Sequence, residues 1–223
     1  MAKYLDVTSW SRRDLFEFFI DYSNPHFNIC TQLDITNLLA YVKERAGLKI
    51  SSALHYFSLR IANEVEPFRY RLKEDKKILV YDVIHGGTTV LMPNESFAYA
   101  YFDYDRDFYR FVEGMSKAVD EVRTGDGRLR PTQRDDVIYH TSLPWISFTS
   151  FAHARTKSRG DSIPRIAFGK FTREPDRVTL PFSVEVHHAL MDGLHVGRYL
   201  GQLEEALANP EDFISGARGL AAD

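Results

Sequence analysis

Apolar residues recur every three to four positions in several stretches of the chain, which is the spacing of an amphipathic helix. Thr36 stands at the expected N-cap of one such stretch, and Gly47 stands at its stop. Ser51 or Ser52 is expected to cap the next stretch, and Pro210 follows the last one. The helices predicted in this way span residues 34–47, 51–66, 106–125 and 194–209.

Extended apolar runs lie between the predicted helices and indicate strands. A hairpin is expected over residues 68–84, where two such runs flank the charged turn 73–77. Residues 139–151 are also extended, although Pro144 limits how they can pair. The run 176–188 is a strong strand rich in β-branched residues. Helices and strands mix without regular βαβ alternation, so we expect an α+β fold with a mixed or antiparallel sheet covered by helices on one side.

Composition and charge narrow the class of protein. The chain has 223 residues, 44% of them hydrophobic and 26% charged, and it contains no repeat or low-complexity linker, which favours one domain over 1–223. A net charge of -3 argues against a nucleic-acid partner. No apolar run reaches the roughly 18 residues of a membrane span, and the start lacks a signal-peptide core. Cys30 is the single cysteine, which excludes an internal disulfide and fits a cytoplasmic setting.

Polar side chains gather in the segment 184–198, "VEVHHALMDGLHVGR", where the predicted strand gives way to a helix. His187, His188, Asp192 and His195 are residue types that bind metal ions, and two histidines with one carboxylate form a known ligand set. Adjacent residues at a strand end point to opposite faces, however, so the histidine pair could share an ion only across a sharp turn. We therefore do not favour a metal site.

Two other interpretations of the same segment remain. A buried neutral histidine often satisfies a turn, and Asp-Gly is a frequent turn pair, which is the interpretation we favour for His187 and His195. The alternative is acid–base chemistry, because a neutral imidazole is a suitable base near pH 7 and a neighbouring carboxylate can order it. That chemistry needs only one of the histidines.

Three separated motifs make the acid–base interpretation specific. The segment 184–198 resembles the active-site signature of the chloramphenicol acetyltransferases, in which glutamine, an aliphatic residue and His-His precede Asp-Gly, an aromatic residue and His. "LPWISFTSF" (143–151) and "WSRRDLFEFF" (10–19) resemble two further motifs of that family in the same order. The resemblance implies the two-layer sandwich of the CoA-dependent acyltransferases. It also implies a homotrimer in which one chain supplies the base and its neighbour supplies much of the acceptor pocket.

The resemblance implies a role for each matched residue. His188 becomes the general base, which removes the proton from an acceptor hydroxyl that attacks the thioester of acetyl-CoA. Ser150 becomes the donor that stabilises the resulting oxyanion. Asp192 pairs with Arg12 to lock the loop, and Gly193 lets the backbone turn tightly after the aspartate. No metal takes part.

The chain departs from the family at several of these positions. Glu185 replaces the signature glutamine, and Phe19 replaces a tyrosine that helps to hold the antibiotic. Arg165 and Ala167 stand where the family has an aliphatic residue and a threonine. An arginine in an apolar pocket carries a desolvation cost unless it is paired. The residues expected at the acceptor site are Phe18, Phe19, Arg165 and Ala167.

Three functions follow from these patterns. The leading one is an acetyl-CoA-dependent O-acetyltransferase that acts on a small molecule, either chloramphenicol, with antibiotic resistance as the result, or a related alcohol. A dihydrolipoyl acyltransferase core shares the HxxxDG motif, but such cores read Asp-His-Arg where this chain has His-His. A non-catalytic trimeric relative that only binds a ligand is the third, suggested by the altered positions Phe19, Arg165 and Ala167.

Overall fold

The computed structural model describes residues 2–126, 128–155 and 161–216. Its centre is a seven-stranded sheet in the order β2-β10-β8-β7-β5-β6, with β9 beside β10. These strands are β2 His26–Asp34, β5 His85–Leu91, β6 Phe97–Phe102, β7 Val137–Ser142, β8 Arg165–Phe168, β9 Thr172–Arg173 and β10 Val178–His187. The pairs β5–β7 and β7–β8 are parallel and the others antiparallel, so the sheet is mixed.

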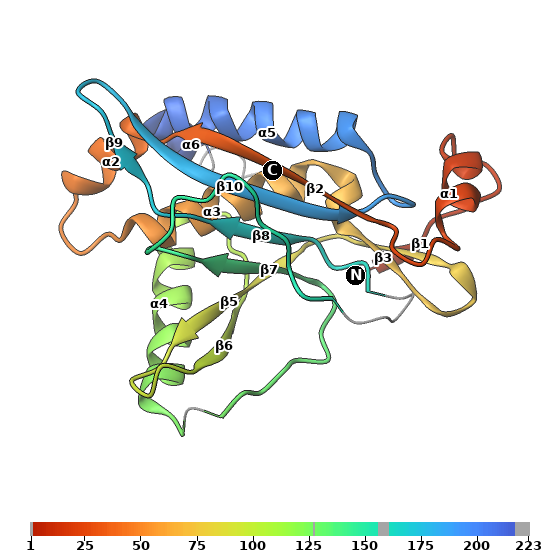
Figure 1. The fold of residues 1–223 in the computed structure, drawn as a ribbon, viewed down its shortest axis with the longest axis horizontal. Coiled ribbons are helices and arrows are strands. Elements are labelled where there is room, and N and C mark those ends of the chain that lie inside the picture. The colour runs from red at the N-terminus through yellow and green to blue at the C-terminus, as the bar shows by residue number, and fades with distance from the viewer. Residues whose placement is uncertain (1, 127, 156–160, 217–223) are drawn as a thin grey trace.

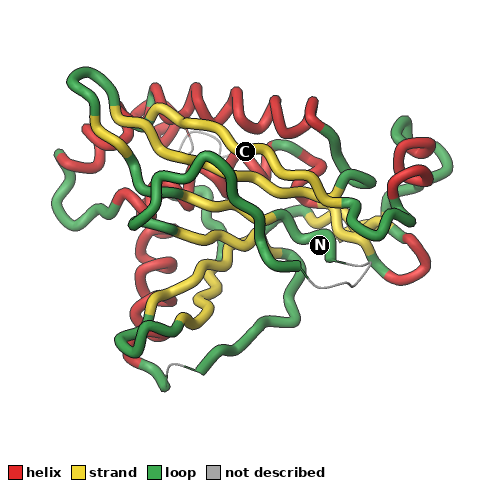
Figure 2. Tube along the Cα trace, in the orientation of Figure 1, coloured by secondary structure: helices red, strands yellow, loops and turns green. Residues whose placement is uncertain are grey.

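Helices cover one face of this sheet (Figure 1). They are α2 Thr36–Lys43, α3 Ile50–Glu64, α4 Phe108–Thr124, α5 Gly193–Ala208 and α6 Pro210–Gly216. Figure 2 shows that the connection after β7 crosses the opposite face. The fold class is therefore α+β, as the sequence predicts. Within the described ranges, no helix combines the length and the apolar character that a membrane crossing requires.

The central strand β10 carries the expected apolar run, and all of its residues except Thr179 are buried. Pro181 has no N–H to donate, but it lies opposite the gap between β8 and β9, so no hydrogen bond between paired strands is lost there. Its carbonyl accepts the Gly169 N–H at 2.8 Å. The strand ends at the histidine pair, so the rigid centre of the sheet positions His188.

The predicted helix starts needed correction. Thr36 is the first residue of α2 and not its cap, because Asp34 accepts the Thr36 N–H at 2.9 Å and its hydroxyl at 2.6 Å. Helix α3 begins at Ile50, before both expected serine caps, and no described side chain caps it. Pro210 follows α5 as predicted, but it also starts α6, a position where its missing N–H costs nothing.

A three-stranded sheet lies near the end of β10 (Figure 1). Its strands are β1 Ala2–Tyr4, β3 Tyr70–Leu72 and β4 Ile78–Tyr81, with 3₁₀ turns at Glu66–Arg69 and Glu74–Lys76, and β3 and β4 form the predicted hairpin. Helix α1 (Arg13–Phe19) packs on this sheet through Phe16. Ala189 and Leu190 are buried in the same cluster, so this smaller core holds the segment that follows His188.

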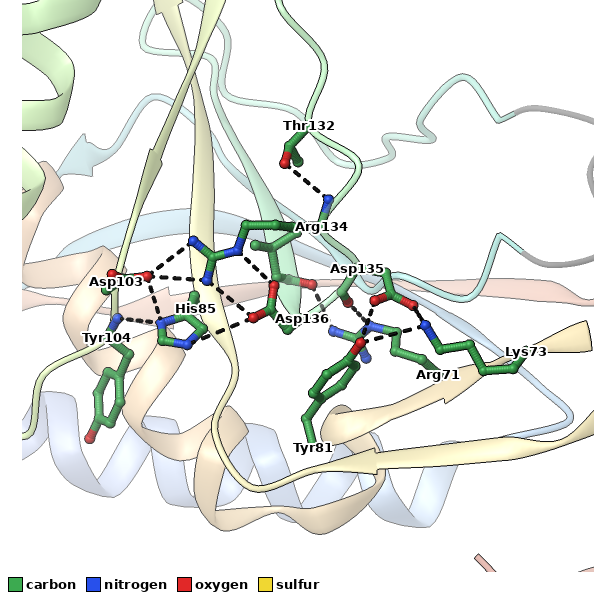
Figure 3. Close-up of polar contacts among 11 residues, drawn as sticks. Arg71, Lys73, Tyr81, His85, Asp103, Tyr104, Thr132, Arg134, Asp135 and Asp136 are labelled. Atoms are coloured by element: carbon green, nitrogen blue, oxygen red, sulfur yellow. Dashed lines mark hydrogen bonds and ion pairs between the residues drawn. The ribbon is translucent and has the colours of Figure 1, made fainter. Parts of the chain in front are cut away.

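Arg71 ties the smaller sheet to β7 (Figure 3). Its side chain is fully buried, and it donates to the carbonyls of Phe68, Tyr70, Asp135 and Val137 at 2.5–2.9 Å. Burial lowers the pKa of Arg71 to about 10, so the guanidinium remains charged at neutral pH. The four carbonyls are the groups that compensate this buried charge.

A second polar group joins β5 to the segments beside it (Figure 3). Arg134 bridges Asp103 and Asp136 at 3.1 and 2.8 Å, and His85 Nδ1 lies 3.1 Å from Asp103. Burial lowers the pKa of His85, so its neutral Nδ1 accepts the Tyr104 N–H at 3.0 Å. These four side chains thus link the start of β5 to the segments after β6 and before β7.

Two histidines lie inside the core between α3 and the sheet. His55 Nε2 is 3.2 Å from the Thr88 hydroxyl and Nδ1 is 2.7 Å from the Ser51 carbonyl, while His140 Nε2 is 3.1 Å from the Ser58 hydroxyl. Burial lowers the pKa of His55 to about 4 and holds the pKa of His140 well below its usual value. Both rings are therefore neutral hydrogen-bonding groups at neutral pH.

Candidate active site

His188 is the first residue after β10 and is held on several sides. Its backbone N–H donates to the Pro25 carbonyl at 2.7 Å, and its carbonyl accepts from Arg12 Nη2 at 3.3 Å. The imidazole stacks on the Phe19 ring, with centroids 3.9 Å apart and planes 10° apart, and the Phe27 ring is 4.7 Å away. These contacts fix the orientation of a half-buried imidazole.

His187 faces different surroundings from His188. Its ring is buried beside His26, with centroids 5.0 Å apart, and its Nδ1 accepts the Ala189 N–H at 3.2 Å. Burial, together with the neighbouring His26 and Arg155, lowers the pKa of His187 to about 3. Among the described residues, no three His, Cys, Asp or Glu side chains gather into a metal-binding group. The His187 ring is therefore neutral at neutral pH and accepts a hydrogen bond within the turn.

Asp192 is the N-cap of α5 and uses both carboxylate oxygens. Oδ2 forms an ion pair with Arg12, while Oδ1 accepts the Leu194 N–H at 3.0 Å and lies 2.9 Å from His195 Nδ1. Burial opposes ionisation, but Arg12 and His195 outweigh it and lower the pKa of Asp192. The structure thus contains the Arg12–Asp192 pair that the resemblance implies, and it places His195 in a capping box.

The expectation that Gly193 permits a tight turn is wrong. Gly193 is the first residue of α5, and the one described glycine with a positive φ is Gly47. A Cβ at Gly193 would meet nothing within 4 Å. The turn is instead stabilised by the side chain of Asp192.

Phe18, Phe19 and Tyr22 form a group of rings at the end of α1. The Phe19 centroid is 4.9 Å from that of Phe18 and 5.2 Å from that of Tyr22. Phe18 and Tyr22 are 59% and 43% exposed, so they are open to a ligand or another chain. The sequence patterns did not single out Tyr22, although its spacing three residues after Phe19 was a usable signal.

Ser150 is not brought to His188 within one chain. It lies exposed in the connection after β7, and no contact between the two is present in the described part of the chain. Ala167, on β8, is fully buried. Ala167 pairs with Ser183 of β10, and neither predicted residue contacts the imidazole in the portion of the chain that the structure describes.

Four charges, of which Glu185 is buried and the others partly buried, form an ion network: Arg155, Asp161, Arg165 and Glu185. Arg155 pairs with Glu185 and lies 3.1 Å from Asp161, which also binds Arg165 at 2.8 Å. Burial favours the neutral form of Glu185, but hydrogen bonds from His153 and Arg155 hold its pKa far below the usual value. The negative charge of Glu185, at the position where the family has glutamine, is thus balanced by Arg155. Arg165 is paired with Asp161.

A cavity of about 900 Å³ lies on the sheet face that the helices leave uncovered. Five rings form much of its wall, and Arg155 and Arg165 also line it. We call it the aromatic cavity, after Phe97, Tyr99, Tyr101, Tyr139 and Trp145. The described lining residues include neither His188 nor Ala167.

The comparisons with known proteins agree along most of the chain. Residues 2–204 match the family model described as chloramphenicol acetyltransferase. The chain is 32% identical over 208 residues to chloramphenicol acetyltransferase 2 of Escherichia coli, covering 90% of this chain and 94% of that protein. It is 28% identical over 202 residues to the chloramphenicol acetyltransferase of Proteus mirabilis, covering 90% and 92%.

Solved structures show the same relationship. A chloramphenicol acetyltransferase superposes with a TM-score of 0.84 at 25% identity, covering 93% of this chain and all of that one. The dihydrolipoamide acetyltransferase of Azotobacter vinelandii superposes with a TM-score of 0.68 at 18% identity, covering 91% and 90%, which is a likeness of fold. The chain therefore belongs to the chloramphenicol acetyltransferase family and is an acyltransferase with the CoA-dependent acyltransferase fold.

Proposed function

We propose that this protein transfers an acetyl group from acetyl-CoA to a hydroxyl of chloramphenicol or a related alcohol, with His188 as the general base. The observation that carries this proposal is the half-buried imidazole stacked on Phe19 and held by its backbone at the end of β10. Nδ1 of His188 is buried, so Nε2 is the nitrogen that an acceptor hydroxyl can reach. Acetyltransferases among the relatives and the fold neighbours support acetyl-CoA as the donor.

His188 takes the proton of the acceptor hydroxyl while the oxygen attacks the thioester carbonyl of acetyl-CoA, which gives a tetrahedral oxyanion. The Ser150 hydroxyl donates a hydrogen bond to that oxyanion. The carbon–sulfur bond then breaks, and the CoA thiolate recovers the proton from the His188 imidazolium. The products are the acetyl ester and free CoA.

The site is completed by a second chain, in a homotrimer. In this arrangement one chain supplies His188, and its neighbour supplies Ser150 and the aromatic cavity, which takes the acceptor. Two features support it: no described contact joins His188 to Ser150 within one chain, and the cavity rings Phe97 and Trp145 are 48% and 62% exposed.

Free thiol release tests the proposal. The protein is incubated with acetyl-CoA and chloramphenicol, followed by a panel of other alcohols, and CoA is measured. His188→Ala should abolish release while circular dichroism and the assembly size stay unchanged. Full activity of this variant would contradict the base assignment. Binding of alcohols without transfer to any of them would support the non-catalytic alternative.

A further inference from the structure

The two arginines of the ion network give the aromatic cavity a chemical preference. We propose that the cavity selects an acceptor alcohol that contains a flat ring and carries a carboxylate. The inference rests on the proposed function, in which this cavity holds the acceptor. It departs from an uncharged acceptor such as chloramphenicol.

The cations of the ion network face the cavity and the anions do not. Arg155 and Arg165 line the aromatic cavity, whereas their partners Asp161 and Glu185 are absent from its described lining. The described lining contains one carboxylate, that of Glu95, in the exposed turn between β5 and β6. The arginine end of the cavity therefore presents positive charge to a ligand.

Each guanidinium keeps a buried donor that no described residue accepts. Arg155 donates through Nε and Nη1 to Glu185, Asp161 and the Ile163 carbonyl. Arg165 donates through Nη1 and Nη2 to the Ala154 carbonyl and Asp161. Arg155 Nη2 and Arg165 Nε have no hydrogen-bond partner among the described residues. The side chain of Arg155 is 10% exposed. A buried N–H without an acceptor is costly, and a ligand carboxylate supplies acceptor oxygens with the charge that a guanidinium binds best.

The aromatic wall of the cavity, which reaches Arg165 through its strand neighbour Tyr139, fits a flat ring. A Cβ at Gly87 would lie 3.0 Å from the Tyr101 ring and 3.4 Å from the Tyr139 ring, so the glycine lets both rings lie against the strand. The Tyr99 ring continues this wall, with its centroid 6.2 Å from that of Tyr101. Aromatic faces stack on flat ligands, and a volume of about 900 Å³ is within the range of small-molecule sites.

The test compares two acceptors of the same shape. 4-(Hydroxymethyl)benzoate and 4-nitrobenzyl alcohol each carry one primary hydroxyl, and they differ in having a carboxylate or a neutral nitro group. Acetyl transfer is followed by CoA release, and binding is measured separately by titration calorimetry. We expect the wild-type protein to prefer the benzoate by at least about tenfold in kcat/KM and in Kd, as a charge-assisted hydrogen bond allows.

Variants assign the preference to the arginine end. Arg165→Leu should reduce the preference to within about threefold, and Arg165→Lys, which keeps the charge without the planar fork, should give an intermediate ratio. Arg123→Leu, at an exposed arginine of α4, is the matched control and should leave the ratio unchanged. Circular dichroism verifies that each variant is folded. If Arg165→Leu does not fold, the acceptor preference of Arg165→Lys decides the test.

The outcomes separate this inference from the proposed function. Equal use of the two acceptors, a preference for the nitro compound, or no binding of either would overturn the carboxylate preference even if other alcohols are acetylated. Calorimetric preference for the benzoate with no CoA release from any acceptor would support the carboxylate preference and contradict the proposed transfer.

Discussion

Arg12 and Asp192 lie 180 residues apart in the chain and form an ion pair that joins the segment before α1 to the first turn of α5. Arg12 also donates to the carbonyl of His188, so a single guanidinium holds both ends of the loop that follows β10. The pair is partly buried, with side-chain exposures of 11% and 27%.

Asp192→Asn should lower kcat by about 10- to 100-fold with a smaller change in KM, because the loop that carries His188 loosens and misplaces the imidazole. Asparagine is also a good N-cap, so the change removes the charge and keeps the start of α5. CoA release measured over a range of acceptor concentrations gives both constants. Glu17→Gln, in the exposed pair with Arg13, is the control and should have no effect. An Asp192→Asn enzyme with normal kcat would contradict the positioning role.

Phe19→Leu should reduce kcat about tenfold or more, because the stacked ring that orients His188 is lost. Phe19→Tyr keeps the ring and should retain kcat. Steady-state kinetics of the two variants, side by side, separate the ring from the hydroxyl. If the leucine variant is as fast as the tyrosine variant, stacking does not position the base.

Glu185→Gln should lower the free energy of unfolding by about 3 kcal/mol, because Arg155 loses its buried partner and the network keeps two cations against one anion. Urea denaturation at one fixed protein concentration measures the change. The exposed variant Glu17→Gln should change stability by less than about 1 kcal/mol. A Glu185→Gln protein as stable as the wild type would show that the cavity tolerates the extra positive charge.

Stability should fall as the pH drops below about 6.5, partly because His55 and His187 have folded-state pKa values near 4 and 3. Above pH 7 both rings are neutral in the folded and unfolded chains, so they add no pH dependence. Below pH 6.5 the unfolded chain binds protons that the folded protein does not. Protonation of His55 in the unfolded chain should alone lower the free energy of unfolding by about 2 to 3 kcal/mol between pH 7 and 4.5. Urea denaturation at both pH values should show a smaller loss for His55→Gln, and an unchanged loss would contradict the assignment.

Mixed trimers should recover activity from two inactive variants. In an assembly of His188→Ala and Ser150→Ala chains, some interfaces contain an intact histidine and an intact serine from different chains. The two purified variants are therefore co-refolded, and CoA release is compared with that of each variant refolded alone. No recovery in verified mixed trimers would place both groups of one site in the same chain.

The elements that the sequence predicted well are those set by local patterns. The apolar run of β10 and the helical spacing of α5 determine both elements within a few residues, and the Asp-Gly step marks the boundary between them. The caps of α2 and α3 were placed wrongly. At α2 the sequence does not show that Asp34, and not Thr36, accepts the backbone N–H, and at α3 the helix begins one residue before the expected serines, with no side-chain cap among the described residues.

The site was only partly predictable for a different reason. The resemblance implied the Arg12–Asp192 pair, but the partnership of Glu185 with Arg155 joins a strand to a distant loop, and no local signal announces such a contact. The aromatic cavity needs the register of β5, β6 and β7, which places Tyr101 and Tyr139 on either side of Gly87. Strand register depends on packing across the whole sheet, so single positions do not reveal it.

His188 lies at the boundary between two hydrophobic cores. The strand that leads to it belongs to the larger core, while Ala189 and Leu190, which follow it, are buried with Phe16 and Ile78 in the smaller one. A loosening of the smaller core can therefore reach the imidazole while the seven-stranded sheet stays intact. The orientation of the His188 imidazole and the cohesion of the main sheet are separable properties of this molecule.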